Sequence, residues 1–276
     1  MFAFTSMGAK IDTSVNDQRA LYVFKISGHC HHLMGSLLPM HGESPKFAQL
    51  YVFDTAHEFE NRHLPFTGSS RSSSLDEDIV VDLLKMLDET NELAKLFRKA
   101  RDKTQNIQSI DYELRLLKRN HDSRQYDDPT SNDIGGLVVG DIRDFFSERD
   151  IIIECFSGSL KRISKLHPKF MALQYPFLFP FGEDGCSCNI MFVDHGHENK
   201  RKRSRVPMRA YYAYLINERS GCHNTIIKGG RLYQQFLVDA FVNVEEDRPD
   251  YIRANKKDLR SEVYKGIHEV VLKGDT

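Results

Sequence analysis

The sequence predicts an α+β fold, with β-rich N-terminal and middle portions, one long helix between them and a helical C-terminal third. Three observations predict it. Short runs rich in aromatic and β-branched residues occur at 20–27 and 48–55, and again between 112 and 164. One stretch with apolar residues at helical spacing separates these runs, and similar spacing returns after residue 207. Because strands and helices come in blocks, we do not expect alternating βα units.

The N-terminal portion has two predicted strands, "ALYVFKIS" at 20–27 and "AQLYVFDT" at 48–55. Between them, "GHCHHL" at 28–33 lies in a strand-like context. Strand alternation places His29 and His31 on one side and Cys30 and His32 on the other. We expect these side chains to face solvent or to be partly paired, because histidine is often part-exposed.

A long helix is predicted after the Gly/Ser-rich linker at 64–74. Ser74 and Glu77 have the spacing of a capping box. Apolar residues follow at helical spacing, and cationic residues at 98–103 suit the negative end of the helix dipole. The apolar positions are Ile79, Leu83, Met86, Leu87, Leu93, Ala94 and Phe97.

The middle portion is predicted to hold further strands around 112–119, 134–142 and 149–164, with a hairpin turn at 157–159. The segment 167–185 carries three prolines among aromatic residues. Pro176 and Pro180 exclude a regular central strand or helix there. We expect an extended, ordered segment that packs its rings into a core.

The C-terminal third has two helical patterns, one opening at Pro207 and one after the turn-forming pair Gly229 and Gly230. The second pattern is interrupted by Pro249, so a kink or break is expected at Arg248. Its predicted apolar face comprises Leu232, Phe236, Ala240, Phe241 and Val244.

These patterns divide the chain into five predicted segments. They are a β-rich segment (1–64), a linker or surface loop (65–75), a module of a helix and a β-hairpin (76–185), a basic polar loop (186–206) and a helical region (207–276).

The composition restricts the function classes. The formal net charge is −1, so any affinity for nucleic acid has to come from local clusters of cations. No apolar run reaches the ~18–20 residues of a membrane helix, and no signal peptide is evident. We therefore expect an intracellular protein whose 5 cysteines are reduced. The nucleotide-binding pattern GxxxxGK[ST] does not occur in the sequence.

Two pairs of potential metal ligands lie close together in the basic polar loop, Cys186 with Cys188 and His195 with His197. Two thiolates and two imidazoles are able to bind zinc, but structural zinc sites use wider cysteine spacing. The surrounding sequence is polar and loop-like. We name these four residues as metal candidates and favour a solvated loop, with no metal site assigned.

A dense basic run follows these histidines. It contains six cations and no acid, and these are Lys200, Arg201, Lys202, Arg203, Arg205 and Arg209. Such a run suits contacts with phosphates or a nuclear-localisation signal, although charge runs are also found in solvated loops. Tyr211, Tyr212 and Tyr214 follow it and are either base-stacking groups or the buried face of a helix. We interpret Tyr211 and Tyr212 first as packing residues and not as DNA-joining nucleophiles.

Six motifs in the same order resemble the plant Helitron helicase-like proteins, which are encoded by transposons. The motifs are "FAFTSMGAKID", "YVFKISGHCHHLMGSLLP", "GLVVGDI", "LHPKFMALQYPFLFPFGEDG", "MRAYYAYLI" and "GGRLYQQFLVDAF". The resemblance extends from Phe2 to about Gly266. Pro249 departs from the apolar residue that is usual in the family.

The resemblance implies a rolling-circle replication initiator joined to an ATP-dependent DNA helicase. In such proteins a His-hydrophobic-His pair beyond the "GGRL" helix holds a divalent metal, and a Walker A loop binds ATP with Mg²⁺. This sequence matches neither centre, since His195 and His197 flank a glycine and precede that helix. We therefore expect the N-terminal part of a Helitron replicase/helicase, acting as a DNA-binding or accessory module in the nucleus. No cofactor is expected in this chain, and its expected partners are single-stranded DNA and the nuclease and helicase domains of the full-length protein.

Two alternatives remain open at this point. One is a complete metal-dependent single-strand nuclease that uses His195 and His197. The other is a truncated transposon product without a selected function.

Overall fold

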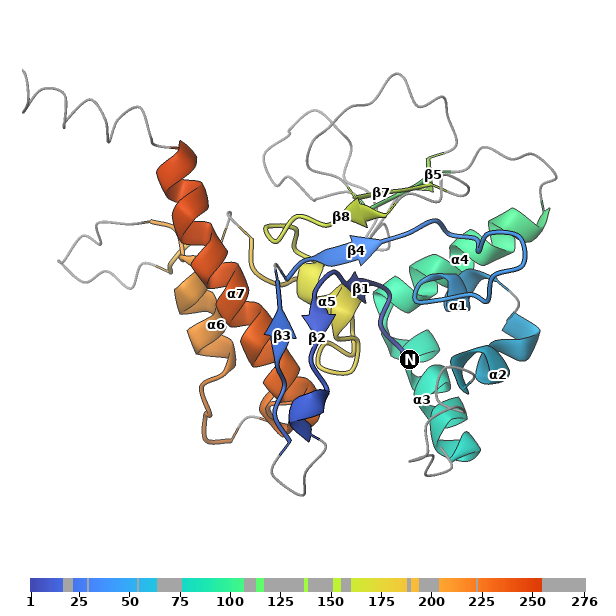
Figure 1. Cartoon of the computed structure of the whole chain (residues 1–276), viewed down its shortest axis with the longest axis horizontal. Coiled ribbons are helices and arrows are strands. Elements are labelled where there is room, and N and C mark those ends of the chain that lie inside the picture. The colour runs from blue at the N-terminus through green and yellow to red at the C-terminus, as the bar shows by residue number, and fades with distance from the viewer. Residues whose placement is uncertain are drawn as a thin grey trace, which may run out of the picture.

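The structure is a computed structural model, and it describes residues 1–16, 22–28, 30–53, 55–63, 76–106, 113–116, 137–138, 151–154, 160–187, 190–193, 204–221 and 223–254 (Figure 1). Helices α1–α4 gather on one side of the molecule and α6 and α7 on the other, with short strands and α5 between them. Buried apolar side chains from both sides form one core. The mixture of helices and small antiparallel sheets confirms the predicted α+β class at this level.

The N-terminal strands are short and antiparallel. β4 (His32–Met34) is the central strand of a three-stranded sheet, between β1 (Ser6–Met7) and β8 (Lys161–Arg162). β2 (Lys10–Ile11) pairs with β3 (Ile26–Ser27) in a separate ladder. The strand predicted over 20–27 is thus confirmed at its end, and residues 17–21 lie outside the described residues.

A helix, α1 (Gln49–Val52), occupies the place of the strand predicted at 48–55, so that prediction is wrong. Leu50, Tyr51 and Val52 are all buried in succession, whereas a strand on a sheet surface turns every second side chain away. The helical turn lets the Tyr51 hydroxyl reach the backbone oxygen of Phe2, to which it donates a hydrogen bond of 2.8 Å. After a short 3₁₀ turn the chain continues as α2 (Glu58–His63).

Two helices, α3 (Glu77–Thr90) and α4 (Glu92–Asn106), replace the one long helix that was predicted. The break lies at Asn91, whose backbone is extended. Its side-chain oxygen accepts hydrogen bonds from the backbone N–H groups of Leu93 and Ala94, at 3.0 and 3.1 Å. Asn91 therefore caps α4, which is a local alternative to continuing α3.

The N-cap of α3 is Asp76, whose carboxylate accepts hydrogen bonds from the backbone N–H groups of Asp78 and Ile79. Ser74, the predicted cap, lies outside the described residues.

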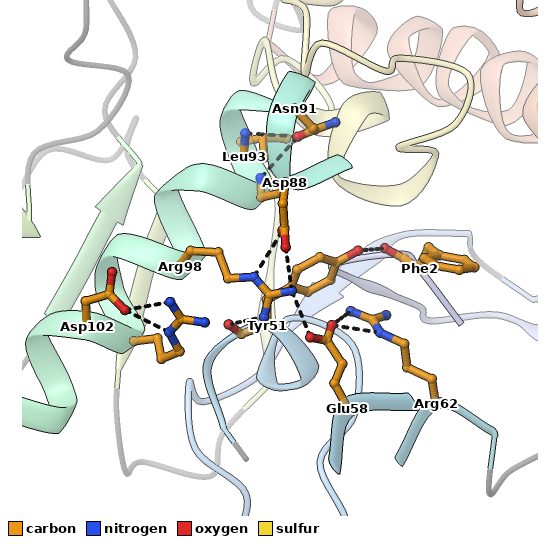
Figure 2. Close-up of polar contacts among 11 residues, drawn as sticks. Phe2, Tyr51, Glu58, Arg62, Asp88, Asn91, Leu93, Arg98 and Asp102 are labelled. Carbon is orange, nitrogen blue, oxygen red and sulfur yellow. Dashed lines mark hydrogen bonds and ion pairs between the residues drawn. The ribbon is translucent and has the colours of Figure 1, made fainter. Parts of the chain in front are cut away.

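A network of charged residues joins α2, α3 and α4 around Tyr51 (Figure 2). Glu58 accepts hydrogen bonds from both Arg62, at 2.5 Å, and Arg98, at 2.8 Å. Arg98 also donates to Asp88 at 3.0 Å. The Arg62 guanidinium lies over the Tyr51 ring, with its carbon 4.3 Å from the ring centroid. Since Arg62 is fully buried, the carboxylate and the ring replace its lost hydration.

The predicted strands of the middle portion are present in a second three-stranded sheet. β5 (Glu113–Leu116) lies between β6 (Leu137–Val138) and β7 (Ile151–Glu154). The predicted hairpin around 157–159 is wrong, because β7 pairs with β5 while β8 pairs with β4. The two strands that flank these residues belong to different sheets, and 157–159 lie outside the described residues.

The proline-rich segment opens with a helix, α5 (Phe170–Gln174), and not with the predicted extended chain. The helix is possible because it ends before Pro176, at Tyr175, whose backbone is no longer helical. The predicted packing of the rings is confirmed, since Phe170, Tyr175 and Phe179 are buried.

The two C-terminal helices are α6 (Met208–Leu215), which follows Pro207, and α7 (Arg231–Ala254). Gly230 precedes α7 with a φ of 56°, so the predicted turn role of this glycine is confirmed. The predicted break at Arg248 is wrong, because α7 continues through Pro249. Proline's fixed φ is compatible with a helix, and here it lies at an exposed position.

The predicted apolar face of α7 is largely confirmed. Phe236 and Ala240 are buried, and Leu232 and Val244 pack against the core. Phe241 is an error of the prediction, since it is 65% exposed. It lies five residues after Phe236, which is about 140° round the helix and away from the core.

Candidate nucleic-acid interface and its buried anchor

Asp239 is the centre of a buried polar cluster between α7 and β4. His32 Nε2 lies 2.6 Å from Asp239 Oδ2, and the Tyr175 hydroxyl donates to the same oxygen at 3.1 Å. Cys30 Sγ and Asn243 Nδ2 donate to Asp239 Oδ1, at 3.6 and 3.3 Å. Each of these five side chains belongs to a residue that is at most 1% exposed. We call this set the Asp239 cluster.

The His32 ring is held between two partners. The second ring nitrogen of His32, Nδ1, lies 3.1 Å from the backbone oxygen of Phe170. Both ring nitrogens are thus engaged, one by that oxygen and the other by the Asp239 carboxyl group. The ring also stacks on Phe170, with centroids 3.8 Å apart. Loss of either partner would leave the other as a buried polar group without its hydrogen bond.

The other donors of the cluster are held in their protonated forms. Burial, followed by the charge of Asp239, raises the pKa of the Cys30 thiol to about 12. The same two causes raise the pKa of Tyr175 well above its ordinary value. Neither group is therefore an ionised nucleophile at neutral pH, and both act as hydrogen-bond donors. The Asp239 cluster serves as an anchor that fixes α7 on the N-terminal sheet.

The sequence prediction for 28–33 is partly confirmed here. Cys30 and His32 are paired with Asp239, which was one of the two roles predicted, but both are buried and neither faces solvent, and His29 lies outside the described residues. The signal that was missed is Asp239 itself, which lies between Phe236 and Ala240 on the apolar face of α7. A carboxylate on such a face requires a partner, and a histidine within a strand is a natural one.

The predicted basic run is flanked by a two-stranded stem. The backbone N–H of Phe192 donates to Ser204 O at 2.9 Å, and the N–H of Val206 donates to Ile190 O at 2.8 Å. Met191 and Arg205 form the bridge between these two bonds. Lys200, Arg201, Lys202 and Arg203 lie outside the described residues. Their segment begins and ends on this stem, which leads directly into α6.

Helix α6 has a buried side and an exposed side. Met208 and Tyr212 are buried, and the Tyr212 ring lies 6.1 Å from that of Phe236. Arg209 and Tyr214 are exposed. Arg205, on the stem, is exposed as well. Within the described parts of the chain, no carboxylate forms an ion pair with Arg205 or Arg209.

Tyr211 and Tyr212 are packing residues, as the sequence interpretation expected. Tyr212 is buried and Tyr211 packs against the core. Burial raises the pKa of Tyr211 to about 12 and that of Tyr212 well above its ordinary value, with Cys186 as the next cause in both. These shifts oppose the phenolate that a nucleophilic tyrosine needs.

Only one of the four metal candidates lies in the described parts of the chain. Cys186 is buried, whereas Cys188, His195 and His197 lie outside them. The described residues contain no group of three or more His, Cys, Asp or Glu side chains placed to hold a metal ion. None of the described helices is both long enough and apolar enough to cross a membrane.

The fold and this surface define an α+β module that fixes two helices on a small antiparallel sheet and leaves cationic side chains exposed beside them. Residues 211–276 match a family model described as the Helitron helicase-like domain at the N-terminus. Residues 211–276 are thus similar to the Helitron helicase-like domain, which supports the resemblance over this part of the sequence. Comparisons with curated proteins and with solved structures found no match.

The matched residues are joined closely to the rest of the chain. They include α7 and most of α6, but His32 and Tyr175, which bind Asp239, lie outside the match. The packing of the matched helices therefore depends on residues from the preceding part of the chain.

Proposed function

We propose that this chain is the N-terminal part of a Helitron transposon rolling-circle replicase/DNA helicase and acts as its single-stranded DNA-binding module. The proposal rests on the match to the Helitron helicase-like domain together with two exposed arginines beside it, Arg205 and Arg209, which form no ion pair within the described residues. In this proposal the chain works in the nucleus with the nuclease and helicase domains. Metal-dependent cleavage and ATP hydrolysis, with Mg²⁺, belong to those domains and not to this chain.

The observation that carries the DNA-binding role is the placement of Arg205 and Arg209. The stem and the first turn of α6 hold both at exposed positions, next to a run of four further cations in the sequence. A cation without a protein carboxylate is free to neutralise a phosphate and to release a condensed counterion. The six cations of this run are Lys200, Arg201, Lys202, Arg203, Arg205 and Arg209.

The test is the salt dependence of single-stranded DNA binding. Replacing all six cations with alanine should lower the slope of log K against log salt by up to about 4, since each neutralised phosphate contributes about 0.7 for a single strand. A narrower variant, Arg205→Ala with Arg209→Ala, should lower the slope by about 1.4. Its matched control is Lys85→Ala with Lys99→Ala, which removes two exposed cations from α3 and α4. Equal slopes in the Arg205/Arg209 variant and this control would remove the proposal's basis.

A cleavage assay addresses the nuclease alternative on the same protein. With Mg²⁺ or Mn²⁺ present, the proposal expects no cutting of single-stranded DNA. Cutting that His197→Ala abolishes would replace the binding module by a metal-dependent nuclease.

A further inference from the structure

A second feature of α6 is suited to unpaired bases. Tyr214 is 63% exposed, although the guanidinium carbon of Arg219 lies only 3.8 Å from its ring centroid. With one face of the ring covered at that distance, the remaining exposure has to come largely from the opposite face and the edge. We call this pair the Tyr214–Arg219 platform.

We propose that the Tyr214–Arg219 platform is a stacking site for an unpaired nucleobase of a single-stranded nucleic acid. The inference rests on the proposed DNA-binding function and adds the group that selects single strands over duplex. Every base has an aromatic face that stacks on tyrosine, but in a duplex those faces are covered by neighbouring base pairs. Phosphate contacts alone do not make this distinction.

The cation of the platform is not engaged by a carboxylate. Across the described residues, Arg219 forms no ion pair, and its Nη1 atom has no hydrogen-bond partner. An ion pair with an acidic residue would explain the position of a guanidinium by its role in the fold. An arginine that stacks on an exposed tyrosine without one adds positive charge against one face of the ring, and this charge attracts the phosphate of a nucleotide stacked on the other face.

The segment that carries Arg219 is tied down at the end of α6. Asn224 Nδ2 donates to Leu215 O, on the last residue of α6, at 2.9 Å. The Asn224 side-chain oxygen accepts from the backbone N–H groups of Ile226 and Ile227, at 3.1 and 3.3 Å. The Asn224 side chain thus links the end of α6 to the turn that follows the connecting segment. A platform fixed in this way loses little conformational entropy when a base binds.

The platform is also within reach of the phosphate-binding residues. Arg209 and Tyr214 are both exposed and five positions apart in α6, which corresponds to about 7.5 Å along the helix axis and about 140° around it. The axial part of this separation is about two nucleotides of a stacked strand at ~3.4 Å each. A strand held by Arg205 and Arg209 would therefore reach Tyr214 within a few nucleotides if it winds part of the way round the exposed side of α6.

The experiment compares equal lengths of oligo(dT) and hairpin-closed duplex DNA by fluorescence anisotropy. Tyr214→Ala should weaken single-strand binding by about 5- to 150-fold and leave duplex affinity and the salt slope unchanged. Tyr214→Phe should retain single-strand affinity, because stacking needs the ring and not the hydroxyl. An oligo(U) arm of the same length separates DNA from RNA as the source of the base.

A direct readout of stacking uses the absence of tryptophan from the chain. In Tyr214→Trp the new indole is the sole tryptophan, and its emission should be quenched when a single strand binds. The matched control is Phe241→Trp, at a residue that is 65% exposed on α7, whose emission should not change. Thermal unfolding of each variant checks that the fold is intact.

The outcomes separate this inference from the proposed function. If Tyr214→Ala binds single strands like the unchanged protein while the Arg205/Arg209 variant loses salt dependence, the platform is refuted and the phosphate-binding function remains. Equal weakening for single strand and duplex would also refute base stacking. Absence of binding to either DNA by the unchanged protein would refute both proposals.

Discussion

Asp239→Asn tests the role of the Asp239 cluster with almost no change in side-chain volume. Four donors converge on this carboxylate, from His32, Tyr175, Cys30 and Asn243. A carboxylate offers acceptor sites on both oxygens, whereas an amide offers one oxygen and two donor protons. The variant therefore turns donors toward donors at the position of one of the two oxygens, inside the core.

The expected loss is large for a substitution that changes so few atoms. Leaving one buried donor unsatisfied costs about 1–3 kcal/mol, and a domain of ordinary stability has roughly 5–15 kcal/mol in total. The amide nitrogen of Asp239→Asn faces two such donors, so we expect the free energy of unfolding to fall by about 2–6 kcal/mol. Amide hydrogen exchange should show the largest loss of protection in α7, since the cluster fixes that helix to β4.

The assay is urea denaturation followed by circular dichroism. Asp247→Asn is the matched control, because Asp247 is an exposed acid on the same helix, and its effect should stay within about 0.5 kcal/mol. A cycle with His32→Gln and the double variant measures the coupling between the two residues. A loss below about 1 kcal/mol for Asp239→Asn, or a coupling near zero, would show that the reasoning about the Asp239 cluster is wrong.

Three further predictions concern the fold. Asn91→Ala should lower the free energy of unfolding by about 1–2 kcal/mol in urea titrations, because it removes the cap of α4. Pro249→Ala should raise the free energy of unfolding by up to about 3 kcal/mol, because alanine restores a backbone N–H inside α7. An unchanged free energy of unfolding would indicate that α7 frays at this residue. Stability should fall as pH rises from about 9 to about 12, which a pH series of melts measures. Burial raises the pKa of Cys30 to about 12, so the folded state resists an ionisation that the unfolded chain undergoes near its ordinary value of 9.0. Unchanged melting up to pH 11 would contradict this assignment.

Elements governed by local sequence were predicted well. The helices after Pro207 and Gly230, the buried rings around Tyr175 and the strands of the β5 sheet follow from periodicity and turn chemistry, which act over a few residues. Errors occurred where a single side chain changes the local outcome. Asn91 splits a helix by capping the next one, and the strand-like run around Tyr51 is a helix in which three successive side chains are buried.

The candidate site likewise has features that could be predicted from the sequence and features that could not. The cationic run from Lys200 to Arg209 is evident in the sequence, because charge density is a local property. Its role in binding DNA stays a prediction. The partners of His32 were not predictable from spacing, since Asp239 is separated from it by 207 positions. The stacking of Arg219 on Tyr214 has no sequence signature either, because it depends on how the chain turns after α6.

The amino-acid sequence was sufficient to predict the α+β class, the helical C-terminal third, the cluster of cations and the resemblance to Helitron helicase-like proteins. These are properties of composition, periodicity and ordered motifs, which do not depend on contacts between distant residues. Which polar residues are buried together and which are exposed became evident only from the tertiary contacts. A buried polar group is tolerated only where other parts of the chain supply its hydrogen-bond partners, so the Asp239 cluster exists only once β4, α5 and α7 have packed.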